Sequence, residues 1–210
     1  VWVQATGRED APLARLLLLV QNQQGYLNLC ELLTKLWTQD AVRTHNALDW
    51  RWLEGDMSEG LVALSGAQAG PLGPLLIAGN IERAHTLAAK MSQLFPDRFF
   101  IELQRAGRLD DERYISAAVD LVQKMGLPLI ATHPIQFIKE DDFESHEARV
   151  CIAQGEILGN PKRPKRFTRK QFFPSAQEMV ELFADLPEAL AGEALSVNSG
   201  SDPDFRVAFY

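Results

Sequence analysis

Short apolar runs of strand length alternate along this chain with segments whose apolar residues recur every three or four positions. The runs lie at residues 16–20, 61–64, 99–101 and 129–132, and a helical pattern separates each run from the next. Runs of this length fit buried strands, and helices between successive strands are typical of a parallel sheet that helices cover. The sequence therefore predicts an α/β fold, but periodicity alone does not determine whether the sheet closes into a barrel.

Several local signals place the expected helices more closely. Asn80 can cap a helix over residues 81–94, and Gly126 is positioned to end a helix over 114–125. Ser175 and Glu178 have the spacing of a capping box, and a further helix is expected at about 142–153. In the first helix, the expected apolar face consists of Tyr26, Leu29, Leu33 and Leu36.

The overall composition is that of an ordinary globular domain with an acidic surface. A net charge of -7 and a pI near 5.1 argue against a surface built mainly to hold nucleic acid. Residues 162–170 are the basic exception. Here a solvated loop is weighed against contact with DNA phosphates or a partner, in which Phe167 and Phe172 would offer stacking surface. The candidate contact residues are Lys162, Arg163, Lys165 and Arg166.

Neither cysteine usage nor hydropathy indicates export or membrane insertion. Cys30 and Cys151 are widely separated and form no metal-binding or disulfide pattern. The longest apolar run, at residues 16–20, is far shorter than a bilayer span. We expect a cytoplasmic protein with no membrane partner.

Five phrases carry a resemblance to a known family. They are LLVQN with GYLNL at 18–29, PDRFFIEL at 96–103, GLPLIAT at 126–132, FESHEARV at 143–150 and LFADLPEAL at 182–190. In order and spacing, residues 1 to about 191 resemble the polymerase-and-histidinol-phosphatase (PHP) domain at the amino terminus of bacterial DNA polymerase III alpha subunits.

The resemblance implies part of a distorted, TIM-like βα barrel with parallel strands and outer helices. Residues 1–191 would form an incomplete PHP domain whose first strands and motifs precede Val1, and residues 192–210 an atypical, flexible tail. Unpaired strand edges in such a fragment predict poor solubility when it is expressed alone.

The resemblance also implies a degenerate metal centre. Arg15 stands where metal-binding relatives place a histidine, and a guanidinium has no lone pair to offer a cation. Pro134 and Gln136 stand in place of an Asp-x-His pair, so Glu102 is the remaining acidic ligand position. We therefore expect no metal and no catalysis. Glu102 is interpreted as an ion-pair partner of Arg98 or Arg105, and His133 as a hydrogen-bonded structural group.

For function, the resemblance implies a parent protein that performs template-directed DNA synthesis with Mg²⁺ in a region outside this sequence. This piece would be a scaffold that docks the proofreading exonuclease subunit and other replisome subunits, and it would meet primer-template DNA only through the parent. The alternative is a stand-alone, metal-dependent PHP phosphoesterase. That alternative requires the ligands that Arg15, Pro134 and Gln136 displace.

Overall fold

The strands of the protein form two sheets. The computed structural model describes residues 1–4, 12–38 and 47–191, so the predicted tail at 192–210 lies outside the described residues. One sheet has the strand order β2-β1-β4 and the other the order β3-β5-β6-β7. The strand bounds are β1 Trp2–Gln4, β2 Leu13–Arg15, β3 Leu17–Val20, β4 Ala47–Leu48, β5 Leu61–Leu64, β6 Phe99–Gln104 and β7 Leu129–Thr132.

The predicted α/β class is confirmed, but the expectation of uniformly parallel strands is wrong. Strands β5, β6 and β7 are parallel, as helices between successive strands require. Strand β3 instead runs antiparallel to β5, with Leu17 opposite Leu64. The chain does not cross directly from β3 to β5, because after the intervening helix it first adds β4 to the other sheet. Within the described residues the strands do not close into a barrel.

The five predicted helices are present, and the structure adds two short α-helices that were not predicted from the sequence. The predicted helices are α1 Gln23–Thr38, α3 Ile81–Leu94, α4 Asp111–Met125, α5 Phe143–Gln154 and α6 Ala176–Leu182, and the additional ones are α2 Gly73–Ile77 and α7 Pro187–Leu190. Ser175 accepts a hydrogen bond from the Glu178 N–H, which confirms the capping box. Gly126 ends α4 with a φ of 66°, a left-handed conformation that glycine adopts without strain. Among the described helices, none is both long and apolar enough to cross a bilayer.

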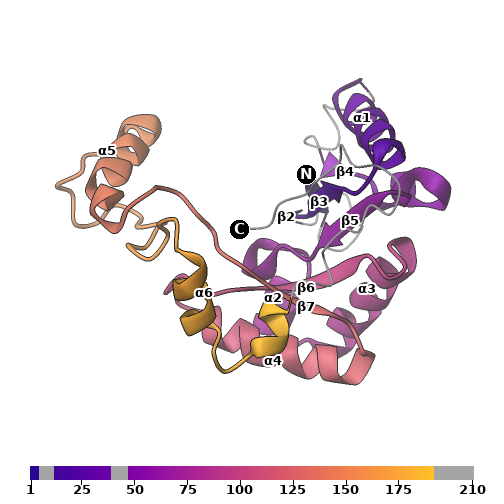
Figure 1. Ribbon diagram of the computed structural model, residues 1–210. Coiled ribbons are helices and arrows are strands. Elements are labelled where there is room, and N and C mark those ends of the chain that lie inside the picture. The colour runs from indigo at the N-terminus through magenta and orange to yellow at the C-terminus, as the bar shows by residue number, and fades with distance from the viewer. Residues whose placement is uncertain (5–11, 39–46, 192–210) are drawn as a thin grey trace.

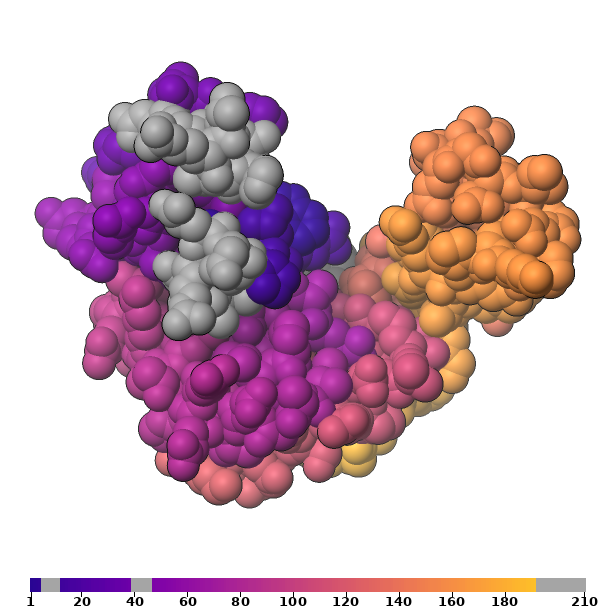
Figure 2. Space-filling model, turned by 180° about the vertical axis from the view of Figure 1, so that it is seen from behind, coloured from indigo at the N-terminus to yellow at the C-terminus, as the bar shows by residue number. Residues whose placement is uncertain are grey.

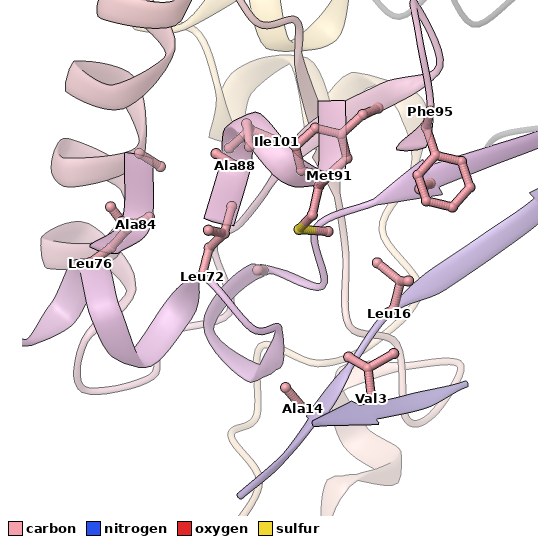
Figure 3. Packing of buried hydrophobic residues seen from close by; sticks show 14 of the residues in the cluster. Val3, Ala14, Leu16, Leu72, Leu76, Ala84, Ala88, Met91, Phe95 and Ile101 are labelled. Carbon is pink, nitrogen blue, oxygen red and sulfur yellow. The ribbon is translucent and has the colours of Figure 1, made fainter. Parts of the chain in front are cut away.

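Alternate residues of the four-stranded sheet face opposite sides. Leu61 and Ala63 of β5 and Ile101 of β6 belong to the main core. Val62 and Phe100, their neighbours in sequence, belong to a smaller apolar cluster on the other face. The main core is closed by the helices: Figure 3 shows Met91 and Phe95 pointing toward Leu16, and Ile101 belongs to the same cluster. This packing places the carboxyl ends of β5, β6 and β7 at one rim of the sheet.

The expected apolar face of α1 is only partly correct. Leu36 is buried as predicted, but Tyr26 and Leu33 are exposed. The buried face consists of Gly25, Asn28, Leu32 and Leu36. Gly25 packs directly against Gly60, since a Cβ atom on Gly25 would lie 1.8 Å from the Gly60 carbonyl oxygen. The close backbone contact turns the helix so that residues 25, 28 and 32 face inward.

Helix α5 and the loop after it form a lobe that stands away from the rest of the molecule. Figure 1 shows two extended segments at the base of this lobe, one coming from β7 and the other leading into α6, and Figure 2 shows open space between the orange lobe and the body. The two segments lie side by side, because the Gln136 N–H donates to the Gln171 carbonyl (2.8 Å) and the Phe173 N–H to the Ile138 carbonyl (3.3 Å). We call residues 137–173 the α5 lobe.

Candidate functional site

A buried carboxylate lies at the rim where β5, β6 and β7 end. Glu102 of β6 is only 4% exposed, and neutral donors surround its side chain. Its Oε2 accepts from the Gly66 N–H at 3.0 Å. Its Oε1 accepts from Gln104 Nε2 at 2.7 Å and from the Thr132 hydroxyl. Both carboxylate oxygens are thus hydrogen-bonded within the protein, which compensates for their burial.

The backbone of Glu102 is held as firmly as its side chain. Its N–H donates to Ser65 Oγ at 2.9 Å, and its carbonyl accepts from the Tyr114 hydroxyl at 3.0 Å. Burial raises the pKa of Tyr114, so this hydroxyl remains a neutral donor. Ser65 follows β5 and Tyr114 belongs to α4, so two neighbouring elements fix the carboxylate position.

A second carboxylate, which the sequence analysis did not single out, extends the network. Asp111 begins α4 and accepts from Arg108 Nε (2.9 Å) and Gln68 Nε2 (2.7 Å), and from the backbone N–H groups of Ala106 and Arg108. Arg108 Nη2 also donates to the Gln104 side-chain oxygen at 3.0 Å, which links Asp111 to the Glu102 cluster. The available signal was an aspartate at the start of a helix, three residues after an arginine.

Arg15, one of the predicted ligand positions, approaches this cluster through its backbone. The Arg15 guanidinium lies 5.5 Å from the centre of the Trp2 ring, on an exposed face. Its backbone is close to the rim, since a Cβ on Gly66 would lie 2.2 Å from the Arg15 carbonyl oxygen. Gly66 has a φ of 79° and no Cβ, so its backbone can lie against the Arg15 carbonyl while its N–H donates to Glu102.

Pro134 and Gln136 lie at the root of the α5 lobe. The Pro134 carbonyl accepts from Gln171 Nε2 at 3.1 Å, and the Gln136 N–H donates to the Gln171 carbonyl at 2.8 Å. The Gln136 residue is otherwise exposed. At both positions the contacts are made by the backbone. These hydrogen bonds hold together the two segments at the base of the lobe.

His133 also contacts the segment that leads from the lobe toward α6. Its Nε2 lies 2.7 Å from the Lys170 carbonyl oxygen, while its Nδ1 is buried with no hydrogen-bond partner among the described residues. Burial lowers the pKa of His133. The geometry fits a neutral imidazole that donates from Nε2 to a backbone carbonyl.

The predicted ion pair of Glu102 with Arg98 or Arg105 is wrong. Arg98 donates instead to the carbonyls of Ser58 and Leu61, at 2.5 and 2.8 Å. Arg105 pairs with Glu112 and Asp185. Arg98 lies just before β6 and Arg105 just after it, so neither is a neighbour of Glu102 within the strand, and proximity in sequence did not translate into contact.

The donors around Glu102 do not fit a metal ion. Phosphoesterase centres hold cations through several carboxylates and imidazoles that converge on one point. Within residues 1–4, 12–38 and 47–191, no three His, Cys, Asp or Glu side chains are grouped in that way. The two Glu102 oxygens instead face an N–H, an amide NH₂ and a hydroxyl, each of which directs a proton where a cation would need to approach.

The basic segment belongs to the α5 lobe and its members differ in environment. Arg163 lies with its Nη2 2.5 Å from Glu147 Oε2, and the two side chains are 10% and 3% exposed. Lys162, Lys165 and Arg166 are exposed. The Phe167 ring lies edge-on to His146 at 4.7 Å and is directed into the lobe.

Comparison with known proteins identifies the family. The profile of the PHP domain family matches residues 1–106, half of the chain. The chain belongs to the PHP domain family. The matched PHP segment includes Arg15, Ser65, Gly66, Glu102 and Gln104, and it ends before the α5 lobe.

Curated relatives extend the similarity through the lobe. The chain is 42% identical over 190 residues to the DNA polymerase III subunit alpha of Pseudomonas aeruginosa, which covers 90% of this chain and 16% of the relative. It is 47% identical over 188 residues to the corresponding subunit of Neisseria meningitidis serogroup B, covering 88% of this chain and 16% of the relative. For Escherichia coli strain K12 the identity is 42% over 179 residues, covering 85% and 15%. The chain thus spans about one sixth of the length of these relatives.

Proposed function

We propose that this chain is a PHP domain that serves as a structural scaffold and docking module of a DNA polymerase III alpha subunit, without hydrolytic chemistry of its own. The observation that carries this proposal is the environment of Glu102. Its oxygens are used by the Gly66 N–H, Gln104 and Thr132, and the positions of Arg15, Pro134 and Gln136 supply no carboxylate or imidazole. The carboxylate therefore serves to tie β5, β6 and β7 together.

The whole-protein part of the proposal is supported by the names of the relatives. According to this part of the proposal, the parent protein carries out template-directed DNA synthesis in the cytoplasm, with Mg²⁺ and primer-template DNA bound outside this chain. The chain would dock the proofreading exonuclease subunit and other replisome subunits. Identity of 42–47% that covers 85–90% of the chain supports this assignment.

We further propose that the domain extends over residues 1–191 and corresponds to part of a distorted βα barrel. Support comes from α6 and α7, which lie beyond the family match but contribute to the same core. Phe183, which follows α6, and Ala189 of α7 are fully buried against it. The parallel strands β5, β6 and β7 with helices on their main-core face are compatible with a barrel segment.

Metal binding and hydrolysis provide the test. We would titrate the purified chain with Mn²⁺ and Zn²⁺ by calorimetry and assay hydrolysis of p-nitrophenyl phosphate with each metal present. The proposal expects no stoichiometric tight binding and no turnover above that of the metal alone. Tight binding with turnover that Glu102→Gln abolishes would instead support a stand-alone phosphoesterase and overturn the proposal.

A further inference from the structure

The end of the α5 lobe carries an exposed aliphatic patch. Ile152 is 82% exposed, Ile157 75% and Leu158 47%. Ile152 lies in the last turn of α5, and the other two follow it in the loop. We call these three residues the lobe patch. Isolated exposed apolar side chains are common on proteins, but three of them gathered at the end of a projecting lobe need an explanation.

The backbone around the lobe patch is defined by hydrogen bonds. Gly155 ends α5 with a φ of 68°, and the Glu156 N–H donates to the Cys151 carbonyl at 2.9 Å. The Ile157 carbonyl accepts from the Asn160 N–H (2.9 Å), and the Leu158 carbonyl accepts from Arg163 Nε (3.2 Å). The patch is thus held on a turn that continues directly from the helix.

The interior of the lobe supports this turn. His146 lies with its ring centre 5.4 Å from that of Phe137 and 4.7 Å from that of Phe167. Beside this aromatic cluster, Arg163 reaches back from the loop to the buried carboxylate of Glu147. The same guanidinium that pairs with Glu147 donates to the Leu158 carbonyl, so the lobe patch is fixed before anything binds it.

Exposed basic residues flank the lobe patch in the sequence on both sides. Arg149 lies one turn before Ile152 on the exposed face of α5, and Lys162, Lys165 and Arg166 follow in the loop. Over residues 155–170 there are six Lys and Arg and one acidic residue, Glu156, whereas the whole chain has a net charge of -7. An apolar centre with a basic rim complements an acidic surface that has an apolar centre.

From this arrangement we infer that the lobe patch and its basic rim bind an acidic protein surface that presents apolar side chains. Nucleic acid fits the patch less well, because single-stranded bases require aromatic faces to stack on. The aliphatic side chains of the patch provide no such face, Phe167 is directed into the lobe, and the exposed Phe173 lies at the root of the lobe beside Ile138. The inference rests on the proposed docking role, and it assigns that role to a particular surface and a particular partner chemistry.

A peptide titration tests this surface. The probe is a fluorescein-labelled helical peptide of about 20 residues with leucines on one face and glutamates on the other. Anisotropy should report binding to the intact chain that weakens with salt, because rim charges are screened. Ile157→Ser combined with Leu158→Ser should weaken binding at least about tenfold, as should Lys162→Glu combined with Lys165→Glu.

Matched controls distinguish specific binding at this surface from nonspecific hydrophobic or electrostatic binding. Leu109→Ser removes an apolar side chain that is 98% exposed elsewhere, and Lys124→Glu reverses an exposed charge on α4. Both should leave peptide binding unchanged, and a peptide with lysines in place of glutamates should not bind. Circular dichroism would verify that each variant folds.

Three outcomes would overturn the inference: no binding of the acidic peptide, equal loss in the control variants, or preferential binding of a single-stranded oligonucleotide that depends on the lysines but not on Ile157. These readouts are independent of metal binding. Failure here would therefore leave the scaffold proposal standing, whereas metal-dependent turnover would overturn the scaffold proposal whatever the peptide does.

Discussion

Among single residues, Glu102 shows how a buried carboxylate can be held by neutral donors alone. The cost of burying the charge is offset by three donors to its oxygens, and none of those donors carries a charge. The Asp111 carboxylate is likewise hydrogen-bonded within the protein, but one of its donors, the Arg108 guanidinium, carries a charge. At this rim, polar side chains connect strands and helices to one another.

The first prediction concerns Glu102→Gln. The variant replaces one acceptor oxygen by an NH₂ group, which then faces the Gly66 N–H or the Gln104 and Thr132 donors. We expect the free energy of unfolding to fall by about 1–3 kcal/mol. Urea denaturation measures it, and Glu54→Gln at an exposed position is the control. Equal midpoints for the two variants would contradict the structural role.

The second prediction concerns the pH dependence contributed by His133. Its pKa is lowered from 6.5 by burial, so between the folded and unfolded pKa values the unfolded chain binds more protons. This contribution to stability is complete above about pH 6.5 and is lost as the pH falls through the folded pKa. His133→Gln, whose amide can still donate to the Lys170 carbonyl, should remove that slope, as urea unfolding at a series of pH values would measure.

Exposed His85 provides the control for this titration, since His85→Gln should retain the slope. The carboxyl pKa values of Asp49 and Asp185 are lowered chiefly by hydrogen bonds from Arg51 and Arg105, so their contributions are lost at more acidic pH. A slope that persists below about pH 6.5 in His133→Gln, and equals that of the unsubstituted chain, would show that another group is responsible.

At the scale of elements, one arginine connects the last two helices to the sheet. Arg105 follows β6, pairs with Glu112 and Asp185, and donates to the Leu182 carbonyl at 2.7 Å. Its guanidinium also lies 5.2 Å from the centre of the Phe183 ring, which is fully buried. The two acidic partners are largely exposed, so the carbonyl bond and the ring contact should contribute more than the ion pairs.

The third prediction follows from these contacts of Arg105. In Arg105→Ala, α6 and α7 should open locally more often, at a cost of about 1–2 kcal/mol, while β5, β6 and β7 stay protected. Hydrogen exchange measured by mass spectrometry would show faster exchange over residues 176–190. Arg113→Ala, an exposed arginine on α4, should change nothing in that segment. Uniform loss of protection across the molecule would contradict a local stabilising role of Arg105.

Local patterns in the sequence predicted most elements correctly, because runs such as 61–64 and caps such as Ser175 act over a few residues. The antiparallel pairing of β3 and the exposure of Tyr26 and Leu33 were not predictable in this way. They depend on where β4 inserts and on the close contact of Gly25 with Gly60, which bring together distant parts of the chain.

The candidate site was predictable to a similar extent. Glu102 was correctly placed near the end of a buried strand, but its partners were not. Gly66, Gln104 and Thr132 are neutral residues without a motif, and only the pairing of β5, β6 and β7 brings them together. Asp111 was missed for the same reason, since its donors come from Gln68 and the loop before α4.

For the whole molecule, the open edge of the four-stranded sheet is the feature on which the predicted behaviour in solution depends. In the described residues β3 pairs on one side only, with β5, and Leu17 on β3 is exposed. An edge strand that carries exposed apolar side chains is a template for pairing with another chain. The poor solubility predicted from the sequence remains a prediction, and β3 is the strand on which the structure bases it.

The fourth prediction tests this edge. Leu17→Lys places a charge on β3 without removing its backbone hydrogen bonds to β5, and it should raise the concentration at which the chain associates about tenfold, equivalent to about 1.4 kcal/mol. Sedimentation velocity over a concentration series would measure the change. Leu109→Lys adds the same charge to a fully exposed loop position, so it separates an edge effect from a simple change in net charge. If both variants behave alike, association does not involve β3; if the wild-type chain stays monomeric at all concentrations, the open edge carries no solubility cost.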